Sequence, residues 1–226
     1  MNPENELLVQ GGAPFCTIRF VFSKTGRARF ISHLDLNRAM IRAVRRARIP
    51  LWYTEGFNRH PYVTFAAPLS LGFEGLRESM DIRLVEEMPA EELVTRLNAV
   101  LPEGLRAVSA APAVMKASAL TAARYRLTFD QPSEAVAALL AQEHIEAEKR
   151  TKKKTTKIVD IKPSLTDAEL TACDGGCQLT VTLPCGSDNT VNPTLLAAAL
   201  SAAVGRDVAM TVLRLELYGL NGAVFC

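Results

Sequence analysis

Apolar and polar side chains alternate over residues 17–23, the pattern of a strand with one buried face. After a turn, the sequence predicts a short extended segment at residues 27–31. A helix is then expected from Ser32 to about Arg48, because apolar side chains recur there with a period of 3.6 and an acid three residues after the serine favours a helix start. Pro50 cannot continue that helix.

The same patterns predict the remaining elements of both halves. The first half is expected to hold a buried strand at 51–53, a loop at 55–68, a strand at 79–85, a helix at 89–101 and a strand at 105–109. The second half is expected to hold strands at 125–129, 178–183 and 208–217, helices at 133–142 and 193–204, and an extended basic segment at 146–161. Strand, helix, strand, strand, helix, strand is the ferredoxin-like order.

We therefore predict an α+β protein of two tandem ferredoxin-like (βαββαβ) units with antiparallel sheets. The expected organisation is a flexible lead-in at residues 1–14, an N-terminal unit at 15–112 and a C-terminal unit at 113–226. A length of 226 residues suits two units of ordinary size. The repeat is one of pattern only, because no residue-level similarity joins the halves.

Composition narrows the class of protein. The chain is 48% hydrophobic and 22% charged, as globular proteins are. It has no apolar run long enough for a membrane span, and its start lacks the pattern of a signal peptide. Five cysteines without an export signal are typical of reduced thiols. We expect a cytoplasmic protein with no membrane partner.

Charge is distributed unevenly along the chain. Residues 24–59 hold nine Lys and Arg against two acids, and residues 144–162 hold seven against three, although the net charge is only +2. Arg38, Arg42 and Arg45 fall within about 60° of one another on the predicted helix, opposite its apolar side. This row lacks acidic partners four residues away, and the second basic run includes Lys152, Lys153 and Lys154. Two such clusters indicate a polyanion partner, although charged helix faces are also commonly just solvated.

Two further groups of residues have a metal interpretation and a plainer one. Cys173, Cys177 and Cys185 include no Cys-x-x-Cys spacing, so we interpret them as structural thiols, with a metal or cluster site as the alternative. Glu74, Glu78 and Asp81 could hold a hard cation or, with better reason, pair with the arginines. We expect neither a metal nor another cofactor.

Several motifs resemble one bacterial family. They are FSKTG at residues 22–26, RFISHLD at 29–35, YTEGFNRHP at 53–61, PLSLG at 68–72, ESMDI at 78–82 and VDIKP at 159–163. The chain is similar to the radical-SAM-linked protein family, a domain of unknown function (number 2344), most strongly over residues 17–85. Its members occur alone or joined to a radical SAM protein, so the resemblance implies such a partner and no catalytic residue. Arg59 stands where the family pattern leads us to expect proline.

Individual residues suggest contacts with RNA. Lys24, Arg29, Arg38, Arg42, Arg45 and Arg59 could bind phosphates, Phe57 and Tyr62 could stack on bases, and Lys152 to Lys154 could close over the backbone. His33, in the first turn of its helix, and His60, on a loop, could act as a base and an acid on a ribose hydroxyl. The plainer interpretation is that His33 caps and packs a helix start and that the loop is clamped on the sheet.

Three functions remain open from the sequence. The first is an RNA-binding accessory protein, for tRNA or rRNA, that works with a radical SAM enzyme and is itself non-catalytic. The second is a metal-independent endoribonuclease or RNA-modifying enzyme that uses His33 and His60. The third is a docking domain for the radical SAM partner. The chain lacks the Cys-x-x-x-Cys-x-x-Cys motif, so it should not hold a radical SAM cluster by itself.

Overall fold

The computed structural model describes residues 15–150, 155–186 and 189–226, except for the side chain of Arg150. The chain forms two compact units, Met1–Ala119 with Val224–Cys226, and Leu120–Ala223. The expected boundary lay seven residues earlier, and the return of the last three residues to unit 1 was not predicted. The lead-in predicted for residues 1–14 lies outside the described residues. Each unit combines helices with strands, which confirms the α+β class.

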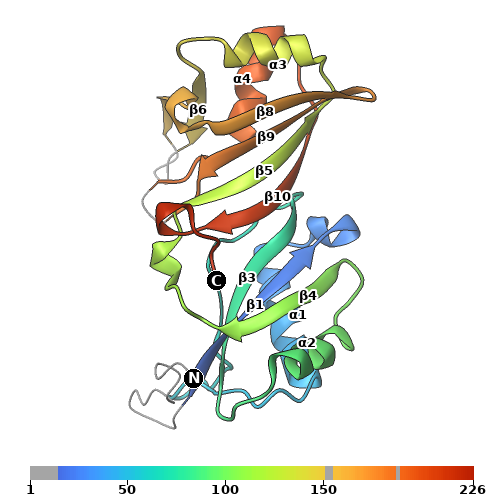
Figure 1. The fold of residues 1–226 in the computed structure, drawn as a ribbon, viewed down its shortest axis with the longest axis vertical. Coiled ribbons are helices and arrows are strands. Elements are labelled where there is room, and N and C mark those ends of the chain that lie inside the picture. The colour runs from blue at the N-terminus through green and yellow to red at the C-terminus, as the bar shows by residue number, and fades with distance from the viewer. Residues whose placement is uncertain (1–14, 151–154, 187–188) are drawn as a thin grey trace. The chain divides into compact units, whose positions relative to one another are not determined.

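Unit 1 contains one antiparallel sheet with two helices on one of its faces (Figure 1). Its elements are β1 (Cys16–Lys24), the 3₁₀ helix η1 (Gly26–Phe30), α1 (His33–Arg46), β2 (Val63–Phe65), β3 (Glu74–Leu84), α2 (Ala90–Asn98), β4 (Leu105–Pro112) and the 3₁₀ helix η2 (Ala117–Ala119). The strand order within the unit is β4-β1-β3-β2. The predicted strand at 17–23 and the two predicted helices are confirmed.

The core of unit 1 fixes which side of α1 faces solvent. Alternate side chains of β1 and β3, such as Phe20 and Ile82, are fully buried beneath the helices. Met40 and Val44 of α1 are also 0% exposed and pack in the same cluster. Each such side chain contributes about 1.5–3 kcal/mol by leaving water. Rotation of α1 would expose these residues, so its opposite side remains at the surface.

Three predictions for unit 1 were wrong. Residues 27–31 are not extended, because Gly26, at φ +59°, turns the chain into η1 and buries Ala28. Residues 51–53 form only isolated bridges, Leu51 to Leu84 and Tyr53 to Pro61. The predicted loop at 55–68 contains the short edge strand β2, whose three residues pair with β3.

Within unit 2, four strands pair in antiparallel fashion, and two further strands form a separate hairpin. Its elements are β5 (Ala122–Phe129), α3 (Ser133–Leu140), β6 (Glu146–Arg150), β7 (Thr156–Asp160), the 3₁₀ helix η3 (Lys162–Ser164), β8 (Thr166–Cys173), β9 (Gly176–Pro184), α4 (Thr194–Val204), β10 (Met210–Tyr218) and the 3₁₀ helix η4 (Leu220–Gly222). The strand order within the unit is β10-β5-β9-β8, and β6 pairs only with β7. No helix in the described parts of the chain is long and apolar enough to span a bilayer.

The basic segment at 146–161, predicted to be extended, contains β6 and β7, which pair only with each other and so do not supply the second strand of the ferredoxin-like order. That position belongs to β8, which pairs with β9. Asp160 closes the base of the hairpin: its Oδ1 accepts hydrogen bonds from the N–H of Ile145 at 2.9 Å and of Lys162 at 3.0 Å, and its Oδ2 lies 2.8 Å from Nδ1 of His144. The bond with His144, followed by the two backbone bonds, lowers the pKa of Asp160. The hairpin is therefore held from its base.

Candidate nucleic-acid interface

Helix α1 presents a row of arginines on its solvent side. The Oγ of Ser32 accepts a hydrogen bond from the N–H of Asp35 at 3.1 Å, which satisfies one of the unpaired donors at the helix start. Because the core holds the other side of the helix, Arg38, Arg42 and Arg45 are all exposed. The predicted orientation of the row is therefore the one observed.

The arginines are only lightly engaged with the protein. Nη1 of Arg38 lies 3.3 Å from Oδ1 of Asp35, with both side chains about 60% exposed, and Nε of Arg42 donates to the carbonyl of Arg38 at 3.2 Å. The sequence argument considered acids four residues away and missed Asp35, which is three residues before Arg38. An exposed ion pair of this kind contributes little to stability. The pKa of Asp35 is lowered first by the Ser32 hydroxyl and then by Arg38. The positive charge of the three arginines is therefore largely available to an anionic ligand.

An exposed loop at residues 53–61, which we call the aromatic loop, lies beside the C-terminal end of α1. The guanidinium of Arg45 is 5.7 Å from the ring centre of Tyr53, which begins the loop. Phe57 is fully exposed, at 106%, and Arg59 and His60 are also exposed. The structure therefore brings together the end of the arginine row and the predicted loop.

The loop is closed by its own hydrogen bonds. Nδ1 of His60 lies 3.1 Å from Oγ1 of Thr54 and 3.1 Å from the carbonyl of Asn58, and the N–H of Thr54 donates to the carbonyl of His60 at 2.9 Å. These bonds order the base of the loop and leave Phe57 at its tip. An aromatic ring held outward costs hydrophobic free energy unless a partner covers it.

Tyr62 is half-buried and belongs to a stack around Arg83. The guanidinium of Arg83 lies 4.0 Å from the ring centres of both Phe15 and Tyr62, and 5.1 Å from that of Trp52. One face of the Tyr62 ring is therefore covered by an intramolecular cation–π contact. Its predicted role in stacking on a base is limited to the other face.

Lys24 cannot serve as a surface contact in this structure. Its side chain is 1% exposed, and Nζ donates to the carbonyl of Arg29 at 3.2 Å and lies 3.5 Å from that of Phe73. The ammonium therefore ties η1 to the segment before β3, and we remove Lys24 from the contact set. Arg29 is half-buried, with its guanidinium 4.7 Å from the ring centre of Phe30.

The two candidate catalytic histidines have separate surroundings. His33 begins α1, and its ring meets Phe65 edge-on at 5.2 Å, with Nδ1 buried and unpartnered within the described part of the chain. His60 lies beside Tyr53, at the Arg45 end of the helix. His33 precedes Arg45 by twelve residues, which is about 18 Å along the helix axis. The geometry gives no support for His33 and His60 as an acid–base pair.

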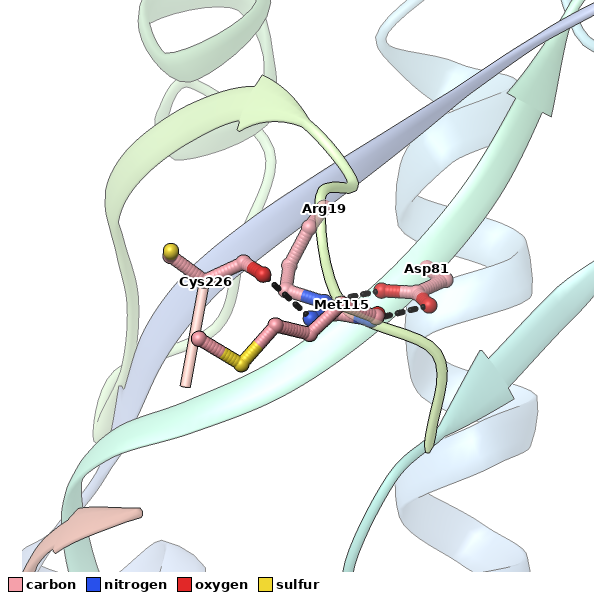
Figure 2. A network of polar contacts seen from close by, with 4 residues as sticks. All are labelled: Arg19, Asp81, Met115 and Cys226. Carbon is pink, nitrogen blue, oxygen red and sulfur yellow. Dashed lines mark hydrogen bonds and ion pairs between the residues drawn. The ribbon is translucent and has the colours of Figure 1, made fainter. Parts of the chain in front are cut away.

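Arg19, which the sequence argument did not select, makes four side-chain hydrogen bonds within unit 1 (Figure 2). At 2% exposed, it makes a two-point contact with Asp81 at 2.7 and 2.8 Å. It also donates to the carbonyls of Met115 and Cys226, each at 2.8 Å, and lies over the Phe225 ring at 4.1 Å. The sheet face opposite the helices is thus covered around Arg19 and is closed to a nucleic acid there.

The metal interpretations find no support in the described residues. Nowhere among them do three His, Cys, Asp or Glu side chains form a group that could hold a metal ion. Cys173 pairs with Gly176 and Cys177 with Ala172, so strand alternation puts the two thiols on opposite faces of the sheet. Burial raises the pKa of the Cys177 thiol, as it does for Cys16, and both stay protonated.

Unit 2 carries its own basic residues on the hairpin. Lys149 and Lys157 are exposed and directly opposite each other in β6 and β7. The predicted contacts Lys152, Lys153 and Lys154 lie outside the described residues. Each unit therefore presents a basic cluster of its own.

Comparison with known families gives a match over most of the chain. The model of a family described as "Uncharacterized protein conserved in bacteria (DUF2344)" matches residues 17–193. These residues include α1, the aromatic loop and the hairpin. No curated protein matches the chain.

Proposed function

The chain belongs to that uncharacterized bacterial family, and we propose that it is an RNA-binding accessory protein which acts through the exposed side of α1 and the neighbouring loop. The observation that carries the proposal is the solvent-facing row Arg38, Arg42 and Arg45 beside the loop that bears the exposed Phe57 ring. Guanidinium groups bind phosphates, and an exposed ring stacks on an unpaired base.

RNA suits this surface better than duplex DNA does. Phe57 needs a base with an open face, which loops and ends of folded RNA offer and a closed duplex does not. The row of three arginines has the charge to follow a phosphate backbone, and its last member, Arg45, lies 5.7 Å from the ring of Tyr53 at the base of the loop that bears Phe57. We therefore propose a structured RNA with unpaired bases, of which tRNA and rRNA are the abundant examples.

A radical SAM enzyme is the partner that we propose. The chain itself lacks the cysteine triplet for such a cluster, and the motifs at residues 22–35 and 53–61 resemble a family associated with radical SAM proteins. An exposed apolar patch of Phe30 at 64%, Leu34 at 58% and Leu71 at 64% supports a protein contact. The N–H of Gly72 donates to the carbonyl of Arg29 at 2.8 Å, so these segments are neighbours at the start of α1.

We further infer that each unit is a variant of the ferredoxin-like fold. The orders β4-β1-β3-β2 and β10-β5-β9-β8 support this inference, since both read 4-1-3-2 once the β6–β7 hairpin is treated as an insertion. Because the geometry gives no support for an acid–base pair of His33 and His60, we do not propose the endoribonuclease alternative.

Charge reversal at Arg42 and Arg45 tests RNA binding. The variant Arg42→Glu/Arg45→Glu should lose affinity for tRNA or rRNA fragments in filter binding, and its melting temperature should stay near that of the wild type, because both side chains are exposed. In wild-type protein, log affinity should fall linearly with log salt, with a slope of about −2 from three arginine contacts.

A matched control separates the α1 face from net charge. Arg27→Glu/Arg106→Glu makes the same change in charge at two exposed positions outside α1. The control should bind RNA nearly as well as wild type. Equal losses in both variants, or affinity that does not depend on salt, would refute the proposed interface.

Phe30→Ser/Leu34→Ser should instead weaken co-elution with a radical SAM protein and leave RNA affinity unchanged.

A further inference from the structure

Arg83 of β3 carries a guanidinium that is held among aromatic rings at the base of the aromatic loop. The group lies 4.0 Å from the ring centres of both Phe15 and Tyr62, and the side chain is half-buried. The N–H of Trp52 donates to the carbonyl of Arg83 at 2.8 Å, and the N–H of Tyr62 donates to the carbonyl of Trp52 at 3.3 Å. Backbone and ring contacts therefore hold this guanidinium beside both ends of the loop.

No anionic side chain in the described part of the chain accounts for Arg83. Asp81, two positions earlier on the same face of β3, has both carboxylate oxygens bonded to Arg19. Nε of Arg83 is buried without a hydrogen-bond partner among the described residues, and its two Nη groups, which have no partner there either, are not fully buried. Charged groups that leave water are ordinarily paired. The rings stabilise the positive charge but supply no oxygen acceptor, so the Nη donors are available to an external anion.

Two arginines from different elements approach the base of the aromatic loop. The guanidinium of Arg45, on α1, lies 5.7 Å from the ring centre of Tyr53, the first residue of the loop. That of Arg83, on β3, lies beside Tyr62, which directly follows the last residue. An isolated bridge joins the two ends of the loop, and Phe57 is fully exposed between them. A strand of RNA with a base stacked on Phe57 would thus meet a cation on each side of that base.

We propose that Arg83 binds a phosphate of the RNA whose other phosphates lie on the α1 row, and that the bound part of this RNA is a single-stranded segment crossing the aromatic loop. This inference rests on the proposed function. The two Nη groups match two phosphate oxygens, and a guanidinium already held by rings loses little freedom when it binds. A duplex does not fit, because its paired and stacked bases are closed to the ring of Phe57.

Salt dependence distinguishes a phosphate contact from a purely structural role of Arg83. The ligand is a labelled oligoadenylate of about ten nucleotides, and its binding to the full chain is followed by fluorescence anisotropy over a salt series. Arg83→Met should weaken binding about tenfold and make the slope of log affinity against log salt shallower by about 0.7, because one phosphate contact is lost. Arg83→Lys keeps a cation, so its slope should match that of the wild type, while the loss of the two-point contact lowers its affinity severalfold.

A matched control and a duplex arm complete the test. Arg124→Met makes the same change at a half-buried strand position of unit 2, where Glu169 already pairs with the arginine at 3.1 Å, and it should bind as wild type does. A duplex of the same length should bind about tenfold more weakly than the single strand. Equal affinity for the duplex would refute the single-strand assignment.

Several outcomes would overturn the phosphate contact. They are wild-type affinity in Arg83→Met, weaker binding with an unchanged salt slope, or the same loss of slope in Arg124→Met. If the melting curve shows that Arg83→Met does not fold, Arg83→Lys decides, and unchanged affinity in that variant overturns the contact. Loss of binding in Arg42→Glu/Arg45→Glu together with wild-type binding by Arg83→Met refutes this contact alone, whereas a wild-type protein that binds no RNA refutes the proposed function itself.

Discussion

Replacing Arg19 by Met should destabilise unit 1 by about 3–5 kcal/mol. Arg19 is 2% exposed, and its partner Asp81 has a side chain only 16% exposed. Removal of one member of a buried ion pair leaves the other charged and without compensation, which costs about that much. The variant also deprives the carbonyls of Met115 and Cys226 of a donor. A loss of this size is a large fraction of the stability of a typical domain, about 5–15 kcal/mol.

Urea unfolding monitored by tryptophan fluorescence measures this loss in unit 1. Trp52 is the only tryptophan of the chain and is 8% exposed, so its emission reports on the unit that contains Arg19. The unfolding midpoint should fall, with the slope of the transition unchanged.

A double variant tests the cause. Arg19→Met/Asp81→Leu removes both charges and should be more stable than Arg19→Met alone, because no buried charge is left unpaired. A loss below about 1 kcal/mol in Arg19→Met, or a double variant less stable than the single one, would refute the reasoning.

Three further predictions follow from local geometry. The β6–β7 hairpin should lose stability as the pH drops through the lowered pKa of Asp160, which lies below the ordinary value of 3.8, because the bonds that depress this pKa stabilise only the carboxylate. Faster amide hydrogen exchange at Ile145 would report this loss, and Asp160→Asn should show the same faster exchange at neutral pH. Gly104→Ala should lower the melting temperature, since Gly104 has φ +83° and an added Cβ would lie 2.6 Å from the carbonyl oxygen of Thr25; an unchanged melting temperature would contradict this. Phe57→Ser should reduce RNA affinity by about 1–3 kcal/mol without loss of stability, and equal RNA affinity would exclude stacking.

The sequence predicted those parts of the candidate interface that depend on neighbours in the chain. Helix α1, its cap at Ser32 and the outward row of arginines all follow from spacing over three or four residues. The exposure of the loop that bears Phe57 follows from its lack of periodicity. Lys24 was misplaced for the opposite reason. Its burial depends on the carbonyl of Phe73, which comes from the segment 49 residues later.

The identities of the main elements and the alternation within each strand were determined by the sequence alone, because capping, periodicity and turn chemistry act over a few residues. Only the tertiary structure decided which strands are neighbours and which side chains meet. Register across β1 and β3 puts Arg19 opposite Asp81, 62 residues away, and the return of residues 224–226 covers that pair. The separation of the basic hairpin from the sheet was decided in the same way, since β8, and not the hairpin, pairs with β9. Such pairings depend on packing between distant segments, and no local pattern in the chain encodes them.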